Sequence, residues 1–163
     1  MKHKGFTVVE LLIVIVVIGI LVSIIAVSYI FLRDDSNDAS IKSAVRLSGD
    51  AIQLHEAQTK SRIGAEGIFS QSGGVDALVG QGYLKQGYRS GLTSTNSSNS
   101  NHIMRWYDCD SGSNSGGFIV YASLSNPTSE DVDNFTSLRS SCGHGSTEAP
   151  TTGSTKYNYA QIF

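Results

Sequence analysis

Charged side chains are scarce in this sequence. Lys, Arg, Asp and Glu make up 16% of its 163 residues, against about 25% in typical soluble proteins. The formal net charge is −2. Nucleic acids and anionic lipids attract proteins through broad cationic surfaces, and nothing in this composition supplies one. We therefore predict no direct nucleic-acid binding, and the length predicts a single folded head.

Sequence motifs of catalysis are also absent. The chain contains no Gly-x-Ser-x-Gly, His-Glu-x-x-His, Walker or dinucleotide-binding glycine pattern. His102 and His144 lie among many Ser and Asp residues, so apparent triads arise there by chance. The sequence predicts that the protein is not an enzyme.

No metal-binding loop of known spacing is present. Glu130, Asp131 and Asp133, together with Asp108 and Asp110, offer hard oxygen ligands for Ca²⁺, but their spacing is not that of an EF-hand. Ser129-Glu130-Asp131 after a proline is equally an ordinary helix start. We expect no cofactor, and Ca²⁺ at Glu130, Asp131 and Asp133 is the alternative.

Only two cysteines occur, Cys109 and Cys142, both in the polar part of the chain. If that part lies outside the cytoplasm, a disulfide between them is expected; if it lies inside, two free thiols are expected.

What the chain has instead is one long apolar run. Residues 11–32 contain no charge, and as a helix they would extend about 33 Å, enough to cross a hydrocarbon core of about 30 Å. Lys2 and Lys4 precede the run, and basic flanks stay in the cytoplasm. Tyr29 and Phe31 would then lie near the outer interface, so we predict that the polar domain is outside.

Two ordinary interpretations compete for this run. A secretory signal has a shorter apolar core of about 7–15 residues and a small-residue cleavage site, for which Ala26-Val27-Ser28 is a poor match. A plain single-span anchor fits the length and the charge. Glu10 argues against the plain anchor, because a carboxylate within an apolar run is costly in lipid and indicates a function.

The run from Lys4 to Ile15, KGFTVVELLIVI, closely resembles the class III signal of type IV pilins and type II secretion pseudopilins. The resemblance implies cleavage between Gly5 and Phe6 by a membrane prepilin peptidase, followed by methylation of the new Phe6 amine. In that family the carboxylate matching Glu10 pairs with the terminal amine of a neighbouring subunit. Many pilins carry a proline later in the helix, where this chain has Val27.

The resemblance also implies partners and a location. The subunit would be held in the cytoplasmic membrane and extracted into a helical homo-oligomeric filament by an inner-membrane assembly platform and its ATPase. The result would be an extracellular pilus serving adhesion, twitching motility or DNA uptake. The alternatives are a periplasmic type II secretion pseudopilus and a non-polymerising anchored binding domain. A C-terminal disulfide loop is common in pilins.

After the apolar run, Asp34-Asp35-Ser36-Asn37-Asp38 is rich in N-cap residues, so a bend or a new helix start is expected there. Residues 38–61 then follow helical spacing. The predicted buried stripe contains Ile41, Ala44, Val45, Ser48 and Ile52, widened by Ala51, Leu54 and Ala57. His55 beside it is expected to be an ordinary edge residue.

The remaining segments predict a small sheet. Residues 75–79 suggest a short helix, after which Tyr83 and Leu84 anchor the chain to the core, and residues 93–101 read as an exposed loop. Residues 102–109 and 118–124 predict a β-hairpin, and 157–163 a late strand. The expected fold is α+β, with a long N-terminal helix, half transmembrane and half amphipathic, packed on a small antiparallel sheet. The expected divisions are a leader (1–5), a transmembrane helix (6–33) and an extracytoplasmic head (34–163).

Overall fold

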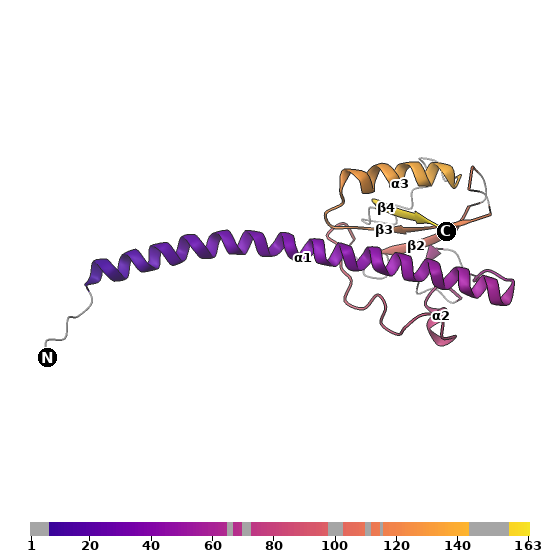
Figure 1. Ribbon diagram of the computed structural model, residues 1–163, viewed down its shortest axis with the longest axis horizontal. Helices are drawn as coiled ribbons and strands as arrows, with labels where there is room; N and C mark the ends of the chain where they lie inside the picture. Colours follow the sequence, from indigo (N-terminus) through magenta and orange to yellow (C-terminus); the bar gives the residue numbers. More distant parts are fainter. Residues whose placement is uncertain are drawn as a thin grey trace. The chain divides into compact units, whose positions relative to one another are not determined.

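The computed structural model describes residues 7–64, 67–69, 73–97, 103–109, 112–114, 116–143 and 157–163. The chain divides into two compact units between Asp34 and Asp35. Helix α1 (Val8–Thr59) contributes to both units. The first unit contains the apolar part of α1, and the second contains the head (Figure 1).

The head is built from a four-stranded antiparallel sheet and three helical segments. After α1 come β1 (Gly67–Ile68), α2 (Ala77–Gly80), β2 (Met104–Asp108), β3 (Phe118–Ala122), α3 (Ser129–Ser141) and β4 (Tyr159–Ile162). The strands lie in the order β1-β2-β3-β4. The predicted α+β fold is confirmed, including the β2–β3 hairpin and the late strand β4.

No new helix begins at the Asp34–Asp38 cluster, so that prediction was wrong. α1 runs through these residues because their side chains act on a loop of the head instead. The buried carboxylate of Asp38 accepts hydrogen bonds from the backbone N–H groups of Ser125 (2.8 Å) and Asn126 (2.7 Å). Continuing a helix also avoids the cost of a second nucleation.

The predicted stripe on α1 is largely confirmed. Ile41, Val45, Ser48 and Ile52 are fully buried, and Ala44 and Ala51 nearly so. Leu54 and Ala57 are exposed, contrary to expectation. Leu54 follows Ile52 by two residues, which turns it about 200° around the helix, away from the core.

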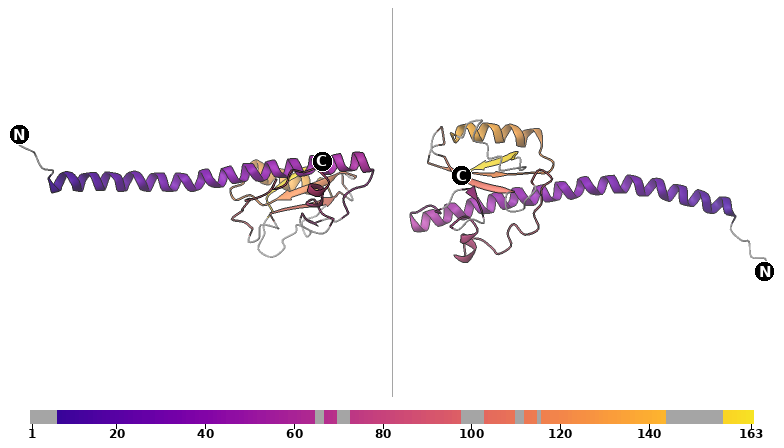
Figure 2. Two further views of the ribbon diagram at one scale, coloured as in Figure 1. Left: turned by 90° about the horizontal axis from the view of Figure 1, so that it is seen from below. Right: turned by 180° about the vertical axis from the view of Figure 1, so that it is seen from behind.

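The two faces of the sheet are covered by different helices (Figures 1 and 2). Trp106, Phe118 and Val120 belong to the cluster that includes the buried side of α1. The alternate residues Ile119 and Tyr121 pack in a second cluster with Phe135 of α3. Because both faces are covered, every residue of β3 is buried. Side chains on a strand alternate between faces, which explains the division.

The segment between β1 and β2 is anchored more firmly than the sequence suggested. Val75, just before α2, and Leu78, within it, are fully buried, and Leu84 is buried as predicted. Residues 93–97 are not a free loop. Ser94 is buried, and the Asn96 side-chain amide donates a 2.7 Å hydrogen bond to the Leu124 carbonyl. The remaining residues of the predicted loop, 98–101, lie outside the described part of the chain.

Helix α3 is stabilised at its start by a capping box and by an ion pair to α1. The Thr128 hydroxyl accepts from the Asp131 N–H, and the Asp131 carboxylate accepts from the Thr128 N–H. The same carboxylate accepts from Lys42 Nζ at 2.6 and 2.8 Å. Burial alone would raise the pKa of Asp131, but the hydrogen bonds from Lys42 and Thr128 outweigh it and leave this pKa lowered.

We expect Gly49→Ala to destabilise the head. A Cβ at Gly49 would collide with the Phe163 ring, which is stacked on Phe118 with centroids 5.3 Å apart. Overpacking of this kind costs about 1–3 kcal/mol, whereas helix propensity alone favours Ala by about 1 kcal/mol. Urea unfolding of the detergent-solubilised chain, followed by fluorescence of the sole tryptophan, the fully buried Trp106, measures the change. Gly64→Ala, in open space, is the control; a gain in stability for Gly49→Ala would contradict the expectation.

Asp131→Asn is expected to lower stability at pH 7 by about 1–2 kcal/mol, because the hydrogen bonds from Lys42 lose their negatively charged acceptor. A carboxyl whose pKa is lowered on folding stabilises the fold above its unfolded pKa of about 3.9, and this contribution is lost as pH falls through the folded pKa. The variant and the parent should therefore converge as the pH falls through the lowered pKa of Asp131. The same unfolding assay, repeated from pH 7 down to acid pH, measures the difference in stability between variant and parent. The exposed Asp133→Asn is the control. Equal stability at pH 7 would count against the role of Asp131.

Candidate functional site

The apolar half of α1 is uncovered by its own chain. The described large apolar side chains from Val8 to Leu32 are each 49–81% exposed. Twenty-five helical residues span about 37 Å, more than a hydrocarbon core of about 30 Å. Exposed apolar surface on this scale indicates contact with lipid or with other chains. This helix and the prepilin-like sequence of residues 4–15, which overlaps its start, indicate membrane anchoring.

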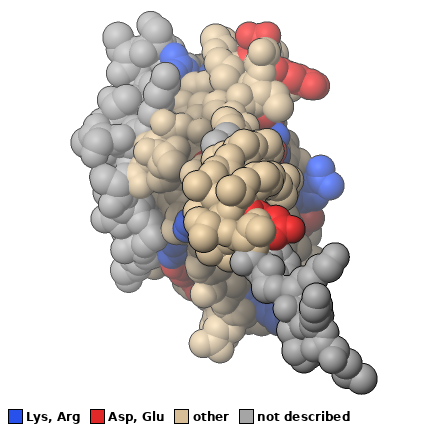
Figure 3. Space-filling model, turned by 90° about the vertical axis from the view of Figure 1, so that its left-hand side faces the viewer, with Lys and Arg blue, Asp and Glu red and all other residues tan. Residues whose placement is uncertain are grey.

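Charged groups do not gather in a block on the face drawn in Figure 3. The Lys, Arg, Asp and Glu side chains there are dispersed among other atoms. The described part of this face therefore offers no broad surface of one sign for a polyanion. The exposed surface of the first unit is mainly apolar.

Thr7 and Glu10 form a reciprocal hydrogen-bonded cap at the start of α1. The Thr7 N–H and hydroxyl both donate to Glu10 Oε2 at 2.9 Å. The Glu10 N–H donates back to the Thr7 hydroxyl oxygen at 3.3 Å. This is the capping-box arrangement, in which N-cap and N3 side chains satisfy otherwise unpaired helix donors. The negative carboxylate also complements the positive end of the helix dipole.

Glu10 is the only charged side chain between Lys4 and Arg33. Its local bonds come from neutral donors, so its charge has no described cation to pair with. The arrangement holds a carboxylate at the entrance of an apolar helix and leaves it able to accept a positive partner from outside. Gly5 and Phe6, the predicted cleavage residues, lie outside the described residues.

Sequence reasoning singled out Glu10 but missed Thr7. The signal was present, since Thr7-x-x-Glu10 before an apolar run is the capping-box pattern. The same pattern recurs at Thr128-x-x-Asp131, where the sequence suggested a helix start but not the whole of α3.

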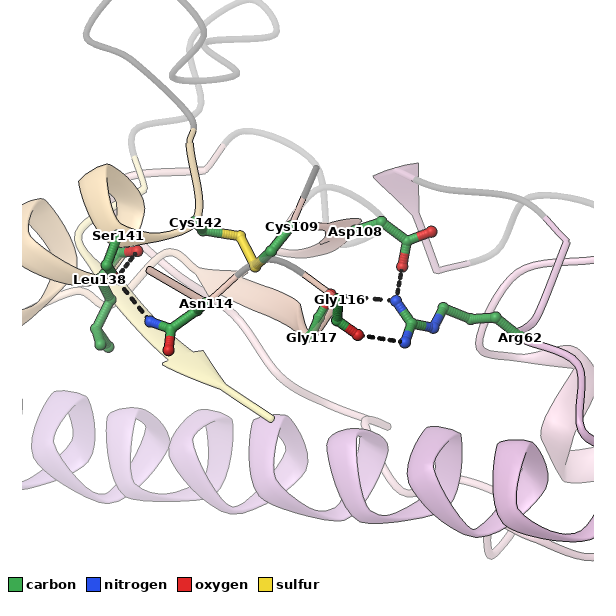
Figure 4. The surroundings of a disulfide bond; sticks show 9 residues. All are labelled: Arg62, Asp108, Cys109, Asn114, Gly116, Gly117, Leu138, Ser141 and Cys142. Atoms are coloured by element: carbon green, nitrogen blue, oxygen red, sulfur yellow. Dashed lines mark hydrogen bonds and ion pairs between the residues drawn. A yellow bond between two sulfur atoms is a disulfide. The ribbon is translucent and has the colours of Figure 1, made fainter. Parts of the chain in front are cut away.

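A disulfide joins Cys109 and Cys142, with the two Cα atoms 4.6 Å apart (Figure 4). Cys109 directly follows β2, and Cys142 caps the C-terminus of α3. Asn114, in the intervening turn, donates through its side-chain amide to Ser141 Oγ at 2.9 Å. The bond closes a span of 33 residues, which restricts the unfolded chain by about 3–4 kcal/mol in the loop-entropy model.

Arg62 fastens the end of α1 to the same region. Its guanidinium donates to the Asp108 carboxylate and to the carbonyls of Gly116 (3.0 Å) and Gly117 (3.1 Å) (Figure 4). It also donates to the Glu56 carboxylate. Burial would lower the pKa of Arg62, but Asp108 and Glu56 more than offset this and raise it. Sequence reasoning missed this residue, because its partners Asp108, Gly116 and Gly117 lie far away along the chain.

The acidic residues considered for Ca²⁺ do not form a described metal site. Asp131 is engaged by Lys42 and Thr128, and Asp108 by Arg62. Within the described ranges, no group of three or more His, Cys, Asp or Glu side chains is placed to hold a metal ion. Asp110 lies outside these ranges.

The histidines offer no further chemistry in the described structure. His55 packs edge-on against the Tyr83 ring at 5.4 Å between centroids, in keeping with an edge residue of the stripe. His102 and His144 lie outside the described residues.

Comparison with known proteins places the N-terminal segment and most of the chain in one family. The model of the prokaryotic N-terminal methylation motif matches residues 1–26. The chain is 33% identical over 103 residues to the Type IV narrow pilus major component of Thermus thermophilus, covering 63% of this chain and 78% of that protein. No solved structure matches the chain.

The methylation motif, the apolar helix and the relative agree with the resemblance carried by residues 4–15. Homology to a structural pilin subunit also favours a protein that works by assembly with other subunits rather than by catalysis. The chain belongs to the type IV pilin family.

Proposed function

We propose that this chain is a structural subunit of a type IV pilus-like filament. Residues 1–5 are a leader that a prepilin peptidase removes between Gly5 and Phe6, and Phe6 is then N-methylated. Residues 6–33 anchor the subunit in the cytoplasmic membrane and later form the filament core. Residues 34–163 are the head outside the cytoplasm. The observation that carries the proposal is the uncovered apolar half of α1 with one carboxylate near its start.

The exposed apolar side chains support two successive environments for this helix. Lipid covers them in the stored subunit, and the helices of neighbouring copies cover them in the filament. Hydrophobic transfer differs little between these two environments, since lipid tails are as apolar as Leu side chains. A further, directional interaction is therefore needed to draw the subunit out of lipid.

Glu10 supplies that directional interaction. In the single chain its carboxylate is held by hydrogen bonds from Thr7. In the filament it pairs with the Phe6 amine of a neighbouring copy, which the removal of the leader creates. A charge-assisted pair is stronger than bonds from neutral donors, and a carboxylate buried without a partner is strongly unfavourable. The pair therefore both drives assembly and sets the register of the subunits.

The disulfide supports an external head, since such bonds persist in oxidising compartments. Export and assembly would require the inner-membrane platform and its ATPase. The relative is by name a narrow pilus major component, which favours a surface pilus for this chain over a type II secretion pseudopilus. A non-polymerising anchored binding domain is the remaining alternative. Electron microscopy of sheared surface fibres, with the protein identified in them, separates the three.

The processed N-terminus is directly measurable. Mass spectrometry of the mature protein from cells that contain the peptidase should find a chain that begins at Phe6 and carries one methyl group on its amine. Cells lacking the peptidase should retain Met1 to Gly5. An intact leader in the mature protein from peptidase-containing cells would refute the proposed processing.

Glu10→Val should insert into the membrane at the wild-type level but reach sheared filaments at a level at least about tenfold lower, which corresponds to about 1.4 kcal/mol. Glu10→Gln separates the two roles of the side chain, because an amide oxygen still accepts from Thr7 but carries no charge. If the charge pair drives assembly, the Glu10→Gln subunit should reach sheared filaments at nearly as low a level as the Glu10→Val subunit.

The measurement is the ratio of subunit in sheared fibres to subunit in membranes, by immunoblot. Ile15→Val, a conservative change in the same apolar run, is the control. Wild-type incorporation of Glu10→Val would remove the proposed role of Glu10.

A further inference from the structure

One stretch of α1 has no apolar anchor. Among residues 35–40 the only buried side chain is that of Asp38, whereas Ile41, directly after them, is fully buried. Ser36 and Ser40 line a depression of about 590 Å³. Five of the six residues are Asp, Asn or Ser, which favour turns and helix starts over helix interiors because their side chains bond nearby backbone groups. Neither apolar packing nor helix propensity therefore maintains the helix here.

Two carboxylates of this stretch hold the loop that precedes α3. Asp38 accepts from the backbone N–H groups of Ser125 and Asn126, at 2.8 and 2.7 Å. Asp35, one turn earlier, accepts from the Asn126 side-chain amide at 3.0 Å. Hydrogen bonds to a carboxylate are stronger than those between neutral groups, so this loop fixes the buried side of the stretch.

Asn37 holds a second loop from the same part of the helix. Its side-chain oxygen accepts from the Thr93 N–H at 3.1 Å, and its amide donates to the Thr93 carbonyl. The two loops are also joined to each other, since the Thr95 N–H donates to Ser125 Oγ at 3.0 Å. We call this set of contacts the polar collar; its members are Asp35, Asn37, Asp38, Thr93, Ser125 and Asn126.

Asp38 has a second possible set of partners in its own helix. An Asp side chain at an N-cap accepts from the N–H groups two and three residues later, which for Asp38 are those of Ser40 and Ile41. In the structure these residues lie inside α1, and the carboxylate bonds to the collar. If the collar opens, the same carboxylate is free to cap a helix that starts after it. Opening would also separate Asp38 from Asp35, since like charges three positions apart destabilise a helix.

We propose that residues 35–40 are a conformational switch within α1, in which Asp38 exchanges its collar partners for the N–H groups of Ser40 and Ile41. In the closed state, the one in the structure, α1 is continuous. In the open state residues 35–37 leave the helix, and the half of α1 that packs in the head begins after Asp38. The inference goes beyond the proposed filament function, because it concerns the single chain and does not need assembly.

The switch changes the connection between the apolar half of α1 and the head. Three helical residues occupy about 4.5 Å along the axis, whereas three extended residues reach about 10 Å. The open state therefore gives the anchored head a longer and more flexible connection, and contacts made by the two loops of the collar decide which state is populated.

Asp38→Asn isolates the collar. Asp and Asn have similar helix propensities and both cap helices well, but the amide offers one acceptor oxygen in place of two. Hydrogen-exchange mass spectrometry of the detergent-solubilised full chain compares peptides that cover residues 33–39 with peptides that cover 44–54. In the variant, exchange in 33–39 should become at least about tenfold faster, while exchange in 44–54 stays within about twofold.

The matched control is Asp50→Asn, which changes an exposed carboxylate on the same helix. It should leave exchange in residues 33–39 at the parent rate. Unchanged exchange in this stretch for Asp38→Asn would overturn the switch. Equal acceleration in peptides of β3 would mean that Asp38 stabilises the head as a whole, and it would overturn the switch as well.

Asp38→Val tests the exchange of partners, because Val neither joins the collar nor caps a helix. The N–H groups of Ser40 and Ile41 should exchange at least about fivefold faster in this variant than in Asp38→Asn, where the amide still caps them. Electron-transfer fragmentation of the labelled peptides reads these two positions separately. Equal rates at both positions in the two variants would refute the capping role.

A stronger helix should remove the need for the collar. Ser36→Ala and Ser40→Ala raise helix propensity at two exposed positions outside the collar. Added to Asp38→Asn, this pair should return exchange in residues 33–39 to within about threefold of the parent chain. If the triple variant exchanges as fast as Asp38→Asn alone, the collar does not act on the helical state of this stretch, and the proposal fails.

Discussion

The structure depends on an apolar surface that the chain cannot bury by itself. From Val8 to Leu32, α1 presents aliphatic side chains on all sides, and the described large ones remain exposed. A helix of this kind is stable only in lipid or among its own copies. The proposed filament function supplies both apolar environments in turn, lipid for the stored subunit and neighbouring helices for the assembled one.

The head gains its stability by using the second half of the same helix as a core element. Ile41, Val45 and Ile52 cover one face of the sheet, and Trp106 and Val120 pack against them. With few charges available, ion pairs occur at points where distant segments meet. Lys42 joins α1 to α3, Arg62 joins the end of α1 to the β2–β3 turn, and Arg89 joins its loop to Asp76 beside α2. Each pair adds a directional contact to segments that are also held by apolar packing.

Sequence reasoning succeeded where a pattern is local and failed where a partner is distant. Helical spacing predicted the buried side of α1, and alternation with turn residues predicted the β2–β3 hairpin. The helical path through Asp34–Asp38 was missed because it depends on Ser125 and Asn126, almost ninety positions away. Arg62 was missed for the same reason. Glu10 was found because a charge within an apolar run is visible without any knowledge of its neighbours, whereas its Thr7 cap required recognition of a second pattern.

The disulfide has a mechanical consequence. It links the end of β2 to the end of α3, so tension applied to the two ends of the chain crosses the Cys109–Cys142 bond and bypasses the residues between them. Those residues include all of β3, the strand with every side chain buried. A separation of 33 residues corresponds to about 110 Å of extended chain that pulling cannot release. Strand β3 therefore bears no tension along the backbone, and the segment between the two cysteines cannot be extended by pulling on the ends of the chain.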